Sequence, residues 1–201
     1  MATRRRRPRP AGLLLAPGAG SNRDHPALVA VEAAVAPLPV ARMDFPYRKA
    51  GRRAPDRAPV LLAALRVEAE PLAAGLGVGT GRLVLGGRSM GGRMASMLAA
   101  GGPEAGDPLP VAGLVLVSYP LHPPGRPDKL RIEHLPRLSV PCLFIHGTKD
   151  AFGTPDELVA HTAAIGGPVT HVWVDGGTHE LRRGEARVAA EVAGWLAGTF
   201  V

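Results

Sequence analysis

The most informative segment of the chain reads Leu83-Val84-Leu85-Gly86-Gly87-Arg88-Ser89-Met90-Gly91. An apolar run, a serine between glycines and a helix-compatible stretch over 90–100 are typical of a sharp turn from a strand into a helix. The glycines suit this turn because larger side chains would collide there. The helix N-terminus below offers free N–H groups to a developing oxyanion. The segment predicts that Ser89 is a nucleophile, whereas alone it could be a plain helix N-cap.

The bulk composition fits one globular domain. With 201 residues and 46% hydrophobic content, the chain can bury one substantial core. Cys142 is the only cysteine, so no intrachain disulfide can form and no oxidising compartment is needed. No apolar run reaches the length of a membrane span or of a signal-peptide core, and we expect a cytoplasmic protein.

Most of the net charge of +7 lies near the N-terminus. We interpret residues 1–10 as a flexible basic tail that contains prolines. No basic stripe with interleaved aromatic residues accompanies it, so nucleic acid is not an expected partner. A polyanion contact through this tail is the alternative. Its arginines are Arg4, Arg5, Arg6, Arg7 and Arg9.

Short apolar runs alternate with helix-length segments over residues 11–201. Continuous apolar strands separated by helices are typical of a parallel sheet covered on both faces. We therefore predict an α/β fold, a minimal three-layer α/β/α sandwich with a mostly parallel sheet. The irregular stretch 118–137 could form a small flap beside the active site but is too short for a lid domain. Residues 46–57 are expected to form a second loop. The expected strands are 12–16, 38–43, 82–86, 112–117, 141–146 and 170–174. The expected helices are 25–35, 58–74, 90–100, 155–165 and 184–198.

Two later strands lead into residues that could activate Ser89. A serine hydroxyl needs a base to take its proton, and the base needs a third group to orient it. Asp150 follows the fifth expected strand and His179 follows the sixth, and parallel strands of such a sheet gather their carboxyl ends at one edge. Serine, acid and histidine in this order are the pattern of an α/β-hydrolase. Asp156, at a predicted helix start, and Asp175 are the alternative acids.

An oxyanion formed at Ser89 would need two N–H donors. We expect one from Met90, the residue after the nucleophile, and the other from Ala19 in the glycine-rich loop after the first strand. The other histidines lack metal-ligand spacing, and the glycine-rich loop lacks the lysine of a phosphate loop, so neither a metal nor a cofactor is expected. The candidate substrate-lining residues are Arg88, His25 and Tyr47.

Several strings in the chain resemble one known family. They are Leu15–Gly20, Gly86–Arg93, His146–Asp150 and the segment from Tyr119 to Leu135. They are similar to the small α/β-hydrolase-like family shared by bacterial predicted hydrolases and certain eukaryotic chromatin-complex subunits, and more distantly to dienelactone hydrolases.

The resemblance implies an α/β-hydrolase domain over residues 11–201. It places Ser89, Asp150 and His179 at the triad positions, and Ala19 with Met90 at the oxyanion positions. Dienelactone hydrolases have a cysteine where this chain has Ser89, so their substrate is not carried over.

Together these features predict a serine hydrolase that cleaves an ester or related acyl bond of a small molecule through an acyl-enzyme. With no lid domain, its site should be open. The alternative is a non-enzymatic interaction module that keeps the hydrolase fold. A complete Ser-His-Asp set counts against that alternative, because a scaffold has no physical need for all three side chains.

Overall fold

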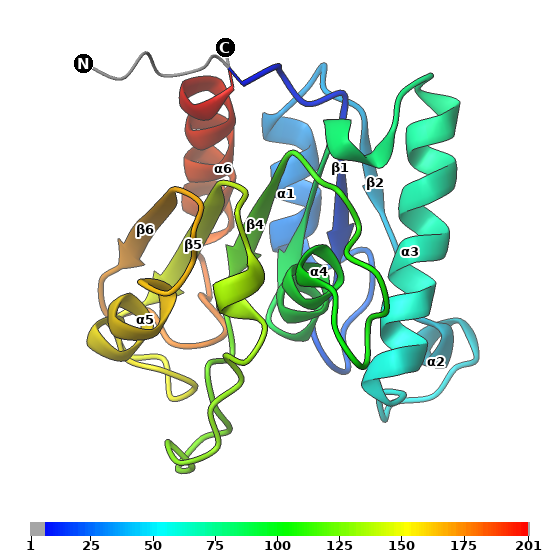
Figure 1. Ribbon diagram of the computed structural model, residues 1–201. Helices are drawn as coiled ribbons and strands as arrows, with labels where there is room; N and C mark the ends of the chain where they lie inside the picture. The colour runs from blue at the N-terminus through cyan, green and yellow to red at the C-terminus, as the bar shows by residue number, and fades with distance from the viewer. Residues whose placement is uncertain (1–6, 201) are drawn as a thin grey trace.

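A six-stranded sheet forms the centre of the protein (Figure 1). The computed structural model describes residues 7–200. The strand order is β2-β1-β3-β4-β5-β6, and all five pairings are parallel, which confirms the predicted parallel sheet. The strands are β1 (Gly12–Ala16), β2 (Val40–Arg42), β3 (Leu83–Arg88), β4 (Gly113–Val117), β5 (Cys142–Gly147) and β6 (Val169–Val174).

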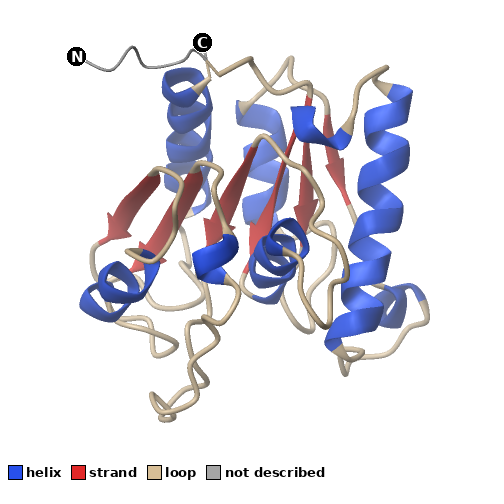
Figure 2. Cartoon of the chain, viewed as in Figure 1, coloured by secondary structure: helices blue, strands red, loops and turns tan. Residues whose placement is uncertain are grey.

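Helices cover both faces of this sheet (Figures 1 and 2). One layer consists of α1 (Pro26–Ala34) and α6 (Glu185–Thr199), which pack against each other. The opposite layer consists of α3 (Ala58–Gly75), α4 (Met90–Ala100) and α5 (Pro155–Thr162). The predicted three-layer α/β/α sandwich is therefore confirmed.

The alternation of side chains along each strand divides the core into two halves. In β1, Leu14 and Ala16 belong to the half that α3 and α4 cover. Leu13 and Leu15 point the other way, into the half beneath α1 and α6. Because both faces of β1 are fully buried, the strand reads as an uninterrupted apolar run in the sequence.

The structure corrects the sequence prediction in one of the two loops. Residues 46–57 contain one helical turn, α2 (Pro46–Lys49), where a continuous loop was expected. Pro46 presets the backbone for a first helical turn, and the buried ring of Tyr47 anchors it. The segment 118–137 is irregular as expected, apart from the 3₁₀ turn η2 (Leu135–Arg137). A second 3₁₀ turn, η1 (Thr80–Arg82), leads into β3.

The sheet changes its winding direction between β1 and β3. The chain crosses from β1 to β2 on one side and returns to β3 on the other, so the loops after β1 and β3 diverge. In open α/β sheets, ligands bind in the crevice that such a reversal opens at the carboxyl ends of the strands. The loop 17–21 and Ser89 lie at this point.

Two sequence-based expectations concern other parts of the chain. Of the predicted basic tail, Arg4, Arg5 and Arg6 lie outside the described residues. Within residues 7–200, no helix combines the length and the apolar character needed to cross a membrane.

The burial of α1 provides a test of the fold. Leu28 is 2% exposed, whereas its neighbour Val29 is 40% exposed. We expect Leu28→Ala to lower the free energy of unfolding by about 2–5 kcal/mol, because it leaves a cavity in the core. Val29→Ala, the matched control, should change it by roughly 1 kcal/mol or less. Urea titration measures both, and equal effects of the two substitutions would contradict this packing.

Candidate active site

Ser89 occupies a strained turn between β3 and α4. Its backbone has φ 51° and ψ −118°, a conformation that serine rarely adopts. The backbone N–H of Ser89 donates to the carbonyl of Val117 at 2.8 Å. The hydroxyl does not cap α4 and instead lies 2.8 Å from Nε2 of His179, so the plain N-cap interpretation is excluded.

Glycines on both sides make this turn possible. A Cβ atom on Gly87 or on Gly91 would overlap the carbonyl oxygen of Ala16, at the end of β1. Gly87 also has φ 154°, in a region that side chains disfavour. Both positions therefore require glycine, and this is what allows β1 to lie so close to the turn.

The structure brings Ser89, His179 and Asp150 into one hydrogen-bonded chain. Nδ1 of His179 lies 2.8 Å and 3.0 Å from the two carboxylate oxygens of Asp150. A carboxylate accepts only, so Nδ1 carries the proton and Nε2 is free to accept from Ser89. Of the alternative acids, Asp156 lies in the first turn of α5 and Asp175 accepts from Thr148.

A second buried histidine lies behind Asp150. Nε2 of His146 is 2.8 Å from the carbonyl of Gly153 and 3.4 Å from Asp150, so this nitrogen carries a proton. Burial lowers the pKa of His146, which favours the neutral ring. The backbone N–H of Phe152 also donates to Asp150 at 2.8 Å. From the sequence, His146 is expected to pack or form a hydrogen bond at its strand end, but its contact with Asp150 was not predicted. The only signal for that contact is the i, i+4 spacing of the two residues.

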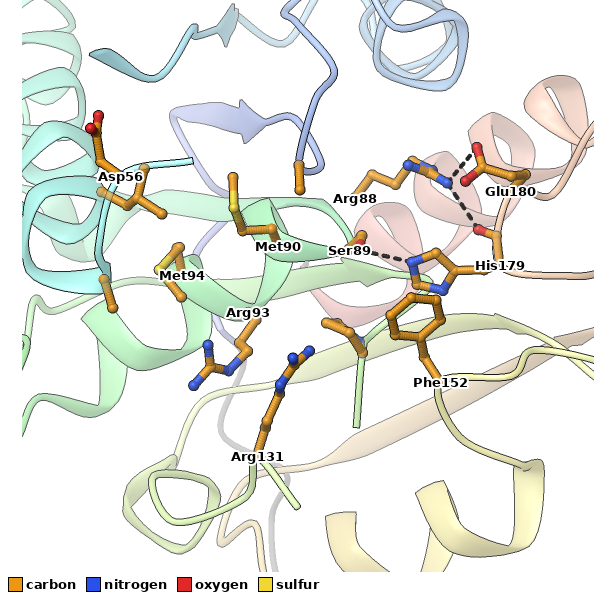
Figure 3. Close-up of a pocket in the computed structure, with 14 residues that line it drawn as sticks. Asp56, Arg88, Ser89, Met90, Arg93, Met94, Arg131, Phe152, His179 and Glu180 are labelled. Carbon is orange, nitrogen blue, oxygen red and sulfur yellow. Dashed lines mark hydrogen bonds and ion pairs between the residues drawn. The ribbon is translucent and has the colours of Figure 1, made fainter. Parts of the chain in front are cut away.

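Three side chains fix the loop that carries His179 (Figure 3). Arg88, only 6% exposed, donates to the carbonyl of His179 at 3.1 Å and forms an ion pair with Glu180 at 2.8 Å. The ring of Phe152 stacks on the imidazole with 4.0 Å between centroids. These contacts limit the positions open to the imidazole. The Glu180 and Phe152 contacts were not predicted, because they join distant segments of the chain.

The two predicted oxyanion donors lie at the same cavity as Ser89. Ala19 and Met90 both line it, and neither backbone N–H has an acceptor among residues 7–200. Gly20, next to Ala19, donates its N–H to the hydroxyl of Tyr47 at 3.2 Å. Tyr47 thereby supports the loop.

Two of the three predicted lining residues lie elsewhere. Arg88 lines the cavity, but Tyr47 and His25 are not among the residues around it. Tyr47 is buried beneath the loop 17–21, and His25 caps α1 by accepting the N–H of Ala27 at 3.2 Å. Both side chains accept hydrogen bonds from backbone N–H groups. A sequence pattern cannot distinguish this supporting role from contact with a ligand.

The cavity has a volume of about 490 Å³ and a mixed lining (Figure 3). Its apolar wall consists of Ala58, Leu61, Met90, Met94, Pro120 and Phe152. Its charged side chains are Asp56, Arg88, Arg93, Arg131 and Glu180. Where side chains are described, no cluster of three or more His, Cys, Asp or Glu is arranged to hold a metal ion.

A second serine–histidine pair lies deeper in the protein. The hydroxyl of Ser96 is 2.8 Å from Nε2 of His134 and donates to the carbonyl of Arg93. Ser96 is fully buried. Burial lowers the pKa of His134 to about 3, and the positive charges of Arg93 and Arg137 act in the same direction with smaller effects. No substrate can reach the buried hydroxyl of Ser96, whereas Ser89 and His179 line an open cavity.

The lowered pKa of His134 predicts how stability depends on pH. The unfolded chain protonates this histidine below about pH 6.5, whereas the folded protein keeps it neutral down to about pH 3. Stability that is fully present above pH 6.5 is therefore lost as the pH falls. Between pH 6 and pH 4, we expect the free energy of unfolding of the parent to fall more steeply than that of His134→Gln, by up to about 1.4 kcal/mol per pH unit. Urea titrations across this range measure the difference, and parallel curves would contradict it.

A family model and several solved structures match this chain. A family model described as an alpha/beta hydrolase domain matches residues 9–192. The solved structure of Est1E from Butyrivibrio proteoclasticus is similar to this chain with a TM-score of 0.73 at 15% identity, covering 98% of this chain and 90% of that one. A proposed hydrolase of the alpha/beta superfamily from Xanthomonas campestris pv. campestris has a TM-score of 0.68 at 21% identity, covering 94% and 99%.

A third solved structure comes from work on the metagenome-derived lipolytic enzymes LipS and LipT. Its TM-score is 0.71 at 16% identity, and the match covers 96% of this chain and 96% of that one. Identities this low show a shared fold, and the predicted fold class is confirmed.

Proposed function

Because the chain belongs to the α/β-hydrolase family, we propose that it is a serine hydrolase that cleaves an ester or related acyl bond. The observation that carries this proposal is the continuous chain of short contacts from Ser89 through His179 to the buried carboxylate of Asp150. Ala19 and Met90 line the same cavity, and their N–H groups have no acceptor within the part of the chain that the structure describes. Together these are the groups that acyl transfer needs.

Each group has a defined role in the proposed reaction. The hydroxyl of Ser89 attacks the acyl carbonyl while Nε2 of His179 takes its proton, and Asp150 orients and stabilises the imidazolium. The tetrahedral oxyanion accepts from the N–H groups of Met90 and Ala19. Its collapse expels the alcohol, which takes the proton from His179. Water, activated by the same histidine, then hydrolyses the acyl-enzyme.

The surrounding contacts supply preorganisation. Arg88 and Phe152 hold His179 from two sides, so its imidazole needs little rearrangement when the proton moves. His146 and the N–H of Phe152 hold Asp150 from behind. Groups fixed in this way act without a reorganisation cost at the moment of reaction.

The names of similar structures, such as the lipolytic LipS and LipT, support an ester as the substrate class. The strings shared with the small hydrolase-like family of bacterial predicted hydrolases support placing the chain in that group. We also propose that the reaction needs neither metal nor cofactor, because the triad chemistry requires none. The buried lone thiol of Cys142 supports the proposed cytoplasmic location.

Two serine variants, one at the predicted nucleophile and one as its control, test the proposal. We expect Ser89→Ala to lower kcat/KM for p-nitrophenyl butyrate by about 10³–10⁶, because it removes the nucleophile. Ser96→Ala removes a serine that lies equally close to a histidine, 2.8 Å in both pairs, but is fully buried. It should keep most of the activity. Hydrolysis is followed by release of p-nitrophenolate.

An active Ser89→Ala protein would contradict the proposal. A parent protein that hydrolyses no ester would favour the alternative, an interaction module that retains the hydrolase fold.

A further inference from the structure

The cavity beside Ser89 contains two arginines that the described protein does not neutralise. Arg93 lies on the first turn of α4, four residues after Ser89, and Arg131 lies on the irregular segment after β4. Both line the cavity, and their guanidinium groups lie near each other (Figure 3). Within residues 7–200, neither guanidinium forms a hydrogen bond or an ion pair, and Nε of Arg93 is buried without an acceptor.

The carboxylates of the same cavity are already paired with other arginines. Glu180 lies 2.8 Å from Arg88, and Asp56 lies 2.7 Å from Arg52. Figure 3 draws Asp56 beyond Met90 and Met94, away from Ser89. Among the arginines and carboxylates that line the cavity, only the guanidinium groups of Arg93 and Arg131 therefore have no ion-pair partner within residues 7–200.

Neither Tyr119 nor His134, which lie close to the two arginines, adds a negative charge. Tyr119 donates its hydroxyl to the carbonyl of Arg131 at 2.9 Å, and burial raises its pKa, so the phenol stays neutral. His134 is neutral as well, since its pKa is lowered to about 3. Burial, and then the charge of Arg93, lowers the pKa of Arg131. Two like charges in a half-buried site are unfavourable until an anion joins them.

We propose that Arg93 and Arg131 bind a second, anionic group of the substrate, a carboxylate or a phosphate, beside the acyl bond that Ser89 attacks. This inference rests on the proposed function and names its substrate class, an ester that carries a negative charge. Guanidinium groups suit this task because each can donate two parallel hydrogen bonds to a carboxylate or phosphate. Arg93 lies one helical turn after Ser89, so esters whose anion is a few bonds from the scissile carbonyl are the first to test.

Matched esters test the inference directly. The monomethyl esters of succinate, glutarate and adipate differ from methyl butyrate, pentanoate and hexanoate by a carboxylate in place of a terminal methyl group. Acid release in a pH-stat measures kcat/KM for all six. We expect the best anionic ester to exceed its neutral partner by about tenfold or more, as a charge-assisted hydrogen-bonded pair would provide.

Arginine variants assign the effect to residues. Arg93→Gln and Arg131→Gln should each lower kcat/KM for the anionic esters by about tenfold or more and change it little for the neutral ones. Arg126→Gln is the matched control, because Arg126 lies on the same segment as Arg131 but is exposed and outside the cavity. A parent that prefers the neutral esters, or variants that lose both series equally, would overturn the inference.

A binding measurement separates this inference from the proposed function. Calorimetry compares succinamate with butyramide, which lacks the carboxylate, and adds inorganic phosphate as a further anion. Binding of succinamate or phosphate that Arg131→Gln abolishes supports the anion site even in a protein that hydrolyses no ester, in which case only the proposed function fails. Equal binding of succinamate and butyramide, with no binding of phosphate, overturns the anion site whatever the hydrolytic activity.

Discussion

The close approach of β1 to the turn at Ser89 is the constraint on which the rest of the site depends. The carbonyl of Ala16 occupies the space that a side chain at Gly87 or Gly91 would need. With glycine at both positions, the chain can turn sharply enough to hold Ser89 at φ 51°. The hydroxyl then lies at the carboxyl edge of the sheet, 2.8 Å from His179, and the first N–H groups of α4 remain free beside it.

Around this turn, loops from distant parts of the chain are held by polar contacts. Asp150 is buried and has His179 on one side and His146 on the other. Arg88, at the end of β3, connects the turn to the loop of His179. Opposite them, Arg93 has no partner in the described chain. The side chains of His179 and Asp150 thus have partners within the protein, whereas the guanidinium groups of Arg93 and Arg131, to which we assign the anion, have none among residues 7–200.

Sequence patterns predicted the elements of the site better than its supporting contacts. The strand ends that carry Asp150 and His179 could be placed because parallel strands are short apolar runs whose carboxyl ends meet at one edge. The contact of Phe152 with His179 joins segments that no local periodicity relates. Tyr47 was predicted to contact a ligand but supports a loop, since an aromatic hydroxyl looks the same in sequence in either role.

The central claim is that Ser89 is an activated nucleophile in an accessible site. Reaction of the protein with a fluorophosphonate, followed by peptide mass spectrometry, tests it most directly. The account predicts one adduct per chain, located on Ser89 and lost when His179 is replaced by alanine. An unlabelled protein, or an adduct on another serine, would contradict it.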